Sequence, residues 1–238
     1  MAGGCRWLLV GNSRWHWAEA RSGGLDCWHG PAPGPGWAAD AELAAVVGWA
    51  AVGSVPPRLA DHSARRLVLG DVPLGGTPPW LGIDRALAGW RAAADSPGAT
   101  VLVADAGTVL SLTRVDRRGR FRGGRLLAGL QLQLAAMAAG TALLPALQAV
   151  IEPPEPWPSA TDAAMVSGVA HGLAAAVAAA VRQAAEPGEP CCLWLTGGDG
   201  ALLQPLLAPS LAAAGWALRH DPDLVMRAMA SLRPGPAA

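Results

Sequence analysis

The same order of predicted elements occurs twice along this chain, and this repeat constrains the fold more than any other feature of the sequence. Each copy contains an apolar strand, a tight polar turn, a second strand, another turn, a third strand and then a helix. The first copy covers residues 6–50 and the second covers residues 100–147. A repeated three-strand meander that leads into alternating helices and strands predicts a duplicated α/β fold with a site between the two halves.

Short apolar or alternating runs between turn residues define the individual elements. A polar turn cluster at residues 94–98 precedes the second apolar strand, so we expect domains at 1–97 and 98–238. Strands are predicted at residues 6–10, 14–20, 25–29, 67–69, 100–104, 109–115, 120–127, 191–195 and 216–219. Helices are predicted at residues 38–50, 86–90, 127–147 and 201–207, and the most apolar stretch, 173–181, is read as part of a packed helix.

The composition excludes several classes of nucleotide-binding site. The chain has 18 basic residues, and every one of them is arginine. Without lysine there can be no ordinary Walker A loop, no protein-kinase ATP lysine and no Schiff-base catalysis. A nucleotide bound to this chain must therefore be held by backbone amides, hydroxyl groups, arginines and metal ions. The formal net charge of +0 gives no reason to expect nucleic acid as a partner.

The cysteines, histidines and apolar runs indicate a reduced, soluble environment. The four cysteines form no CxxC pair, and the five histidines show no zinc-ligand spacing, so the cysteines are read as packed thiols. The N-terminal residues contain no signal-peptide core, and residues 173–181 are only half as long as a membrane span. We therefore expect a cytoplasmic protein with no membrane partner.

Two glycine-containing turns are the first candidates for chemistry. Gly11 and Gly107 occupy matching places in the two copies, each directly after the first apolar strand. Such a turn lets backbone N–H groups approach phosphate oxygens, although a hairpin can use the same residues for geometry alone. Because the turn occurs twice at matching positions, phosphate binding and a purely geometric role are about equally favoured.

Two aspartates and one further turn are also candidates. Asp105 ends an apolar strand, where its carboxylate either meets a cation or caps the turn. Asp84 opens a helical stretch beside Arg85, which by itself is a common structural arrangement. The Gly-rich turn at residues 196–200 joins a strand to a helix and could let a ligand lie against the backbone. The arginine-rich hairpin at 114–125 is better explained as a solvated face than as a nucleic-acid site.

Taken together, these residues resemble the type III pantothenate kinases, and the resemblance covers nearly the whole chain. The first loop, Gly-Asn-Ser-Arg-Trp-His-Trp-Ala at 11–18, is similar to that of the cyanobacterial branch. The chain also follows the order of the family motifs: D-x-G-N-T at 9–13, G-x-D-R at 82–85, D-x-G-T at 105–108, G-G-x-I-x-P-G at 123–129, T-A-x-L-P at 141–145, T-x-x-A-M-x-S-G at 161–168 and T-G-G at 196–198.

The resemblance implies a fold, an activity and a set of roles. The fold would be two ribonuclease H-like, actin-like ATPase domains with the active site in the cleft between them. The activity would be ATP-dependent phosphorylation of pantothenate, the first step toward coenzyme A, in a homodimer that uses Mg²⁺. Asp84 would accept the proton of the pantothenate hydroxyl, and Asp105 would bind a monovalent cation, K⁺ or NH₄⁺. The resemblance further implies ATP contacts by Val10, Gly11, Asn12, Ser13 and Thr108, and pantothenate contacts by Gly82, Ile83, Asp84, Arg85 and Thr161.

The chain departs from the family pattern at three places. Leu9 replaces the first-loop aspartate, and Thr113 stands where many members carry a further aspartate. The segment 75–79 offers no aromatic residue where the family has one shortly before G-x-D-R. Leu9 favours an alternative, a catalytically weak accessory protein of the same family, whereas Asp84, Arg85, Asp105 and Thr108 favour the enzyme. A sugar or acetate kinase of the same superfamily is disfavoured by the G-I-D-R motif.

Overall fold

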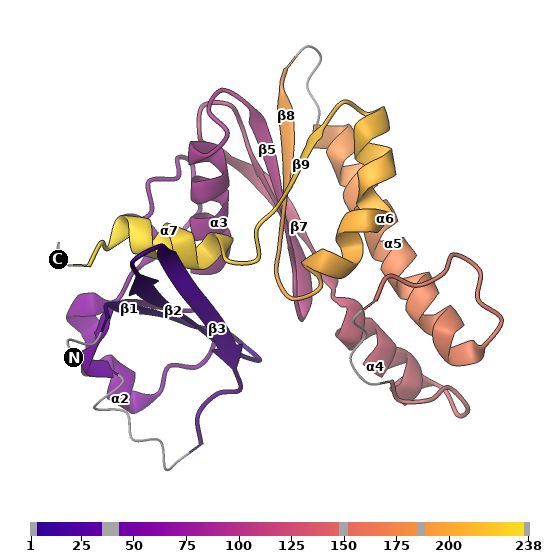
Figure 1. Ribbon diagram of the computed structural model, residues 1–238, viewed down its shortest axis with the longest axis horizontal. Coiled ribbons are helices and arrows are strands. Elements are labelled where there is room, and N and C mark those ends of the chain that lie inside the picture. Colours follow the sequence, from indigo (N-terminus) through magenta and orange to yellow (C-terminus); the bar gives the residue numbers. More distant parts are fainter. Residues whose placement is uncertain (1–3, 35–42, 148–151, 185–188, 236–238) are drawn as a thin grey trace. The chain divides into compact units, whose positions relative to one another are not determined.

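The computed structural model describes residues 4–34, 43–147, 152–184 and 189–235, and the chain divides into two compact units (Figure 1). Unit 1 contains Met1–Arg91 together with Asp223–Ala238, and unit 2 contains Ala92–Pro222. The C-terminal segment therefore belongs to the same unit as the N-terminal half. The sequence had suggested one boundary, between residues 97 and 98.

Unit 1 is built on a four-stranded sheet of order β3-β2-β1-β4. The strands are β1 (Arg6–Val10), β2 (Trp15–Arg21), β3 (Gly24–Gly30) and β4 (Val46–Ala51). The first three form an antiparallel meander, as predicted, and β4 runs parallel to β1.

Two sequence predictions in this half are wrong. Residues 46–50 were expected in a helix at 38–50 but form β4, because Val46, Val47 and Trp49 favour a strand and the segment pairs in parallel with β1. Residues 38–42 lie outside the described residues. The strand expected at 67–69 is reduced to one parallel bridge between Trp49 and Arg66, followed by a 3₁₀ turn, Leu69–Asp71.

The two faces of the first sheet are covered differently. Leu8, Val10, Trp15 and Trp17 belong to a buried cluster on one face. Helix α7 (Leu224–Leu232) contacts β1, β2 and β4, and the indole N–H of Trp7 donates a hydrogen bond to the carbonyl of Arg233 just after this helix (2.9 Å). The remaining helices of this region are the short α2 (Pro57–Ala60), the 3₁₀ turn Ser63–Arg65 and α3 (Ile83–Ala94).

Unit 2 repeats the strand order of unit 1 and adds one strand. Its sheet has the order β7-β6-β5-β8-β9, in which β5, β6 and β7 form the antiparallel meander and β8 and β9 run parallel to β5. This repeat confirms the predicted duplicated α/β fold. The strands are β5 (Thr100–Ala106), β6 (Val109–Val115), β7 (Phe121–Ala128), β8 (Cys191–Thr196) and β9 (Ala217–His220).

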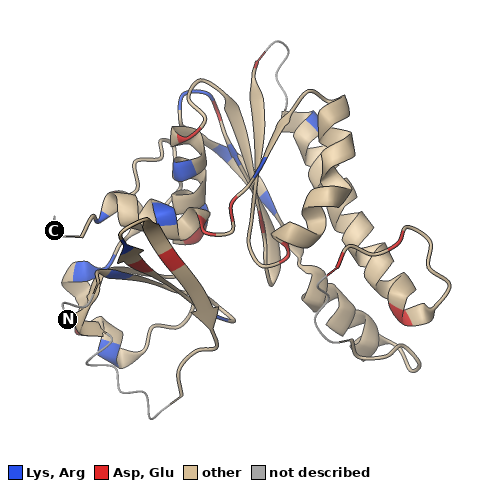
Figure 2. Ribbon diagram, viewed as in Figure 1, with Lys and Arg blue, Asp and Glu red and all other residues tan. Residues whose placement is uncertain are grey.

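Three helices pack on one face of this second sheet and complete its core. They are α4 (Leu130–Gly140), α5 (Thr161–Ala184) and α6 (Gly200–Ala213), and α5 contacts both of the others (Figure 1). Helix α4 is shorter than the predicted 127–147, because Leu127 pairs with Leu110 in the sheet and the helix ends at Gly140. Figure 2 shows that α4 and α6 carry no charged residue.

Helix α5 is the one described helix that is long and apolar enough to cross a membrane. Most of its apolar stretch is buried inside the protein, and eleven of its residues, including Val169, Leu173 and Val177, are buried. The prediction that residues 173–181 belong to a packed helix is therefore confirmed.

Candidate functional site

Residues 11–14 form a tight turn between β1 and β2, where the sequence predicts a phosphate loop. The N–H of Gly11 donates a hydrogen bond to the carbonyl of Arg14 (3.1 Å), which closes the turn. The N–H of Gly53, just after β4, donates to the carbonyl of Val10 (3.2 Å), so the parallel strand holds the base of the turn. The residues at its tip, Asn12, Ser13 and Arg14, are exposed and can reach a ligand.

Leu9 stands at the end of β1, where the family motif carries an aspartate. Its neighbours on β1, Leu8 and Val10, point into the buried cluster, so strand alternation places Leu9 on the opposite face, the one on which α7 packs. The side chain is only 6% exposed. Leu9 therefore contributes to the interior of unit 1 and leaves the phosphate loop to its backbone and its exposed tip.

We expect the substitution Leu9→Asp to destabilise unit 1 by about 2–4 kcal/mol, because it buries a carboxylate among apolar groups. Leu9→Met, which conserves volume, is the matched control and should cost less than about 1.5 kcal/mol. Thermal unfolding of the three proteins, combined with a magnesium titration of activity, checks this. A Leu9→Asp protein that melts like the wild type and needs less magnesium would show that the side chain faces a ligand instead.

Asp84 lies in the first turn of α3, in a partly buried position. Its Oδ1 atom accepts a hydrogen bond from the N–H of Arg85 (2.8 Å), which fixes the orientation of the carboxyl group. A Cβ atom on Gly82 would lie 2.6 Å from the same Oδ1, so any other residue at this position would force the carboxylate to move. Leu81 and Ile83 on either side of Gly82 are buried and anchor the segment.

Burial changes the acid–base behaviour of this pair. Desolvation raises the pKa of Asp84 above its ordinary value of 3.8, although the N–H and the charge of Arg85 oppose the shift. Burial likewise lowers the pKa of Arg85, and the charge of Asp84 opposes this. A carboxylate with a raised pKa at an ordered position is a stronger base than a solvated one, so Asp84 is suited to accept a proton.

The second predicted phosphate loop follows β5 in unit 2. Alternation along β5 buries Leu102, Ala104 and Ala106 beneath the helices, so Asp105 projects from the opposite face. Asp105 pairs in register with Ser111 of β6 on one side and Thr196 of β8 on the other.

Two other segments of unit 2 meet this loop. The N–H of Asp199, which precedes α6, donates to the carbonyl of Ala106 (2.9 Å), and the N–H of Gly129, which precedes α4, donates to the carbonyl of Thr108 (2.9 Å). Gly197 has a φ of +85°, and a Cβ atom there would lie 2.5 Å from the Asp105 Oδ1. The loop is therefore flanked by the N-termini of α4 and α6, whose N–H groups and dipoles favour an anion.

The residues of unit 2 offer limited metal ligation. Among the described parts of the chain, no group of three or more His, Cys, Asp or Glu side chains is placed to hold a metal ion. Asp105, whose Oδ1 leaves no room for a Cβ atom on Gly197, offers one hard oxygen at the predicted phosphate loop. One such ligand fits a cation that takes its other ligands from phosphates, carbonyl groups and water, as Mg²⁺ commonly does.

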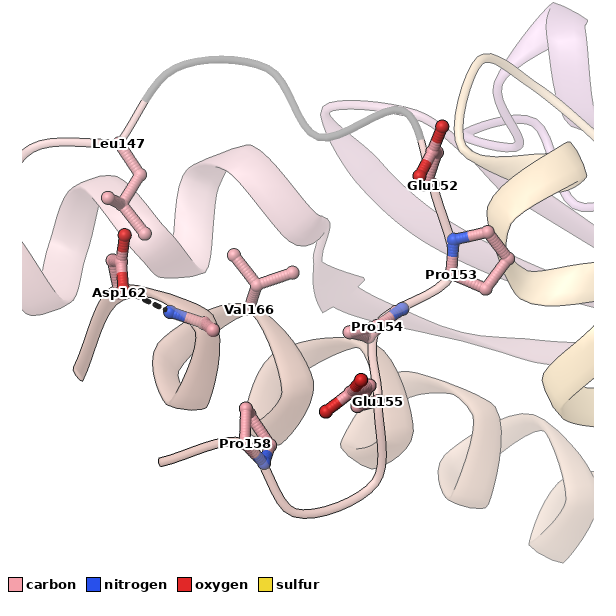
Figure 3. A pocket seen from close by; sticks show the side chains of 9 residues that line it. Leu147, Glu152, Pro153, Pro154, Glu155, Pro158, Asp162 and Val166 are labelled. Carbon is pink, nitrogen blue, oxygen red and sulfur yellow. Dashed lines mark hydrogen bonds between the residues drawn. The ribbon is translucent and has the colours of Figure 1, made fainter. Parts of the chain in front are cut away.

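Thr161 is the first residue of α5 and is exposed. A cavity of about 410 Å³ lies next to it, between the Pro-rich loop before α5 and the first turns of that helix (Figure 3). Ser167 on α5 holds this loop by donating a hydrogen bond to the carbonyl of Glu155 (2.7 Å). The cavity has apolar walls and carries three carboxyl groups, from Glu152, Glu155 and Asp162.

The comparisons with known proteins identify the family to which this site belongs. Residues 56–183 match the family model of type III pantothenate kinase. The sequence is also 36% identical to the type III pantothenate kinase of Synechococcus elongatus, over 93% of this chain and 96% of that protein. The chain belongs to the type III pantothenate kinase family. Another member, from Synechococcus sp. strain JA-3-3Ab, is 40% identical over 96% of this chain and 92% of its own.

Solved structures support the fold of this type III pantothenate kinase family member. A Campylobacter jejuni protein described as a Baf family transcriptional activator has a TM-score of 0.58 at 19% identity, covering 95% of this chain and 96% of its own. A Sinorhizobium meliloti protein described as a 2-dehydro-3-deoxygalactonokinase has a TM-score of 0.54 at 17% identity, covering 98% of both chains. The predicted fold, two α/β domains built on repeated mixed sheets, is thereby confirmed.

The structure also reveals one candidate residue that the sequence analysis missed. Trp80 lies two residues before Gly82 and is 75% exposed, which is unusual for so large an apolar side chain. The resemblance implies an aromatic residue shortly before G-x-D-R; segment 75–79 contains none, and Trp80 is the next residue. Its neighbour in sequence, Leu81, is buried, so only the tryptophan of this pair is available to a ligand.

Proposed function

We propose that this protein is an ATP-dependent pantothenate kinase, which transfers the terminal phosphoryl group of ATP to the 4′-hydroxyl of pantothenate in the first step of coenzyme A biosynthesis. The observation that carries the proposal is Asp84: an ordered, partly buried carboxylate with a raised pKa, inside the G-I-D-R motif and inside the segment that matches the family model.

In this proposal Asp84 is the catalytic residue. Its Oδ1 is fixed by the N–H of Arg85, so the carboxylate can be aimed at one hydroxyl group and accept its proton as the phosphoryl group is transferred. The guanidinium of Arg85 is a candidate partner for the carboxylate of pantothenate, and Gly82 and Ile83 shape the same pocket. Trp80, the exposed aromatic beside them, is a further candidate for its wall.

The two glycine turns bind the phosphates of ATP in this proposal. Val10, Gly11, Asn12 and Ser13 supply one set of amides and side chains, and Thr108 supplies a hydroxyl at the other turn. Asp105 would hold a monovalent cation, K⁺ or NH₄⁺, and Mg²⁺ would be held by the nucleotide and water. When bound, these cations offset the negative charge of the phosphates.

A panel of acceptors tests the proposed function. The purified full chain, incubated with ATP, Mg²⁺ and K⁺, should convert pantothenate to phosphopantothenate, as detected by mass spectrometry, and should leave acetate and simple sugars unmodified. Phosphorylation of a sugar or of acetate in preference to pantothenate would contradict the proposal. Binding of ATP and pantothenate without any product would favour the accessory-protein alternative.

We also propose that the enzyme is a homodimer in which Thr161 reaches the pantothenate of the partner copy. Leu143 and Trp157 both precede Thr161 in sequence and are 93% and 95% exposed. Large apolar side chains exposed to this extent are typical of residues that another protein surface covers.

The substitution Trp157→Asp should convert the dimer to a monomer in analytical ultracentrifugation and raise the KM for pantothenate. Trp28→Ser, at a partly exposed tryptophan of unit 1, is the matched control and should leave the dimer intact. A wild-type protein that sediments as a monomer, or a Trp157→Asp protein that stays dimeric, would contradict the proposed dimer.

The proposed location is the cytoplasm, with neither nucleic acid nor membrane as a partner. ATP and pantothenate are both soluble molecules, and the one long apolar helix, α5, has most of its apolar stretch buried in the protein. The exposed arginines of the hairpin between β6 and β7 are consistent with a solvated face, since Arg122 pairs with Asp116 and Arg117 pairs with Glu189.

A further inference from the structure

Three residues form a row across the sheet of unit 1 beside the first phosphate loop. His16 of β2 lies directly opposite Leu9 of β1 and directly opposite His29 of β3. Directly paired residues of adjacent strands point to the same face of a sheet. His16 therefore lies on the face of Leu9, next to the position where the family motif carries an acidic side chain.

The imidazole of His16 is close to the loop itself. Its Cδ2 atom lies 3.7 Å from the place that a Cβ atom on Gly11 would occupy, which is ordinary van der Waals contact. The ring is half-buried, and its centroid is 5.8 Å from that of His29. The backbone of the loop on one side and His29 on the other thus hold the ring at the edge of the turn.

The surroundings of His16 are electropositive. Burial lowers its pKa first, and the charges of His29 and Arg14 lower it further. The imidazole is therefore neutral in the free protein at neutral pH, and it keeps one N–H donor. The family motif carries an aspartate at position 9, whereas this chain has a leucine there. The groups beside the loop on this face are therefore the imidazole of His16 and its basic neighbours Arg14 and His29.

We propose that His16 donates a hydrogen bond to a phosphate oxygen of the ATP that binds at the first loop. The proposal rests on the proposed kinase function and adds a phosphate-binding residue to it. The chain has no lysine that could meet the phosphates, and the exposed tip of the loop provides only Asn12, Ser13 and Arg14 besides the backbone. An imidazole suits the half-buried position because its neutral form costs less to bury than a lysine ammonium.

Binding measurements without magnesium isolate this contact from any effect on the metal. Isothermal titration calorimetry with ATP in EDTA, and with adenosine as a probe that lacks phosphates, would be carried out on full-length wild type, His16→Ala, His16→Gln and His29→Ala. His16→Ala should bind ATP about tenfold more weakly, the loss expected for a hydrogen bond to a charged group. Adenosine binding should be the same in all four proteins, and His29→Ala, which removes a neighbour of the ring but keeps the His16 donor, should lose less ATP affinity than His16→Ala.

His16→Gln separates a phosphate contact from a packing role, because its side-chain amide keeps an N–H donor of similar reach. His16→Gln should recover part of the lost ATP affinity. If His16→Ala melts at a much lower temperature than the wild type, the ATP affinity of His16→Gln is the result that tests the phosphate contact. Unchanged ATP affinity in both His16 variants, or an equal loss for ATP and adenosine, would overturn the inference and leave the proposed function standing. A wild-type protein that binds no ATP at all would overturn both.

Discussion

Replacing Asp84 with asparagine is expected to reduce turnover by about 10²–10⁴-fold, the usual contribution of a general base. The asparagine keeps the shape of the side chain and can still accept the hydrogen bond from the N–H of Arg85, so the start of α3 should not change. ATP binding, measured in the absence of pantothenate, should therefore remain close to that of the wild type.

The same substitution should leave the protein as stable as before or make it more stable. Because burial raises the pKa of Asp84 in the folded protein, the folded state favours the protonated form. The stability that this shift provides is present below the pKa of the unfolded chain and is lost as the pH rises through the folded pKa, so ionised Asp84 costs stability at neutral pH. Asp84→Asn removes that cost, and its melting temperature at pH 7–8 should equal or exceed that of the wild type.

The pH dependence of kcat gives an independent check on this base. In the wild type, turnover should fall on the acidic side as Asp84 is protonated, at a pH above the ordinary aspartate value of 3.8. Asp116→Asn is the control, since Asp116 is a turn aspartate whose Oδ1 accepts hydrogen bonds from the N–H groups of Arg118 and Arg120. Asp116→Asn should keep wild-type turnover. Wild-type kcat in Asp84→Asn at saturating pantothenate would mean that Asp84 is only a helix carboxylate.

Replacing Asp105 with alanine is expected to remove most of the rate together with its dependence on a monovalent cation. In the proposed function Asp105 is the cation ligand at the second predicted phosphate loop, and the chain has no lysine that could replace a lost cation. The wild type should be faster in potassium than in a buffer whose only cation is a bulky organic ammonium ion, whereas Asp105→Ala should be equally slow in both.

The variant Asp105→Asn distinguishes loss of charge from loss of structure. Its amide has nearly the same size as the carboxyl group that packs against Gly197, so the loop should keep its shape. We expect a weaker potassium dependence and a melting temperature like that of the wild type. Equal wild-type rates in potassium and in the organic-cation buffer would contradict the proposed role of Asp105.

The fold could be predicted where local pattern and strand pairing agree. The meander in each half follows from apolar runs separated by Gly-containing turns, and its repetition indicated the duplicated sheet. The prediction was wrong at 46–50, which was expected to continue a helix but pairs with β1 as a strand. It was also wrong at 127–129 and 141–147, because the limits of α4 are set by the sheet before it and by Gly140 at its end.

The site could be predicted as far as its motifs extend. Asp84 was expected at the start of a helix and Asp105 at the end of a strand, and both lie there. The burial of Leu9 depends on which face of β1 is covered by the C-terminal helix, and a local pattern cannot show that. The proximity of His16 to Gly11 likewise depends on the register between β1 and β2, which follows from the closed turn.

Pantothenate-dependent release of ADP tests the proposed kinase function most directly. A coupled assay would compare wild type with Asp84→Asn in the presence of ATP, Mg²⁺ and K⁺, with and without pantothenate. We expect the wild type to release ADP only when pantothenate is present and Asp84→Asn to release almost none. ADP release that does not depend on pantothenate, or that is equal in the two proteins, would contradict it.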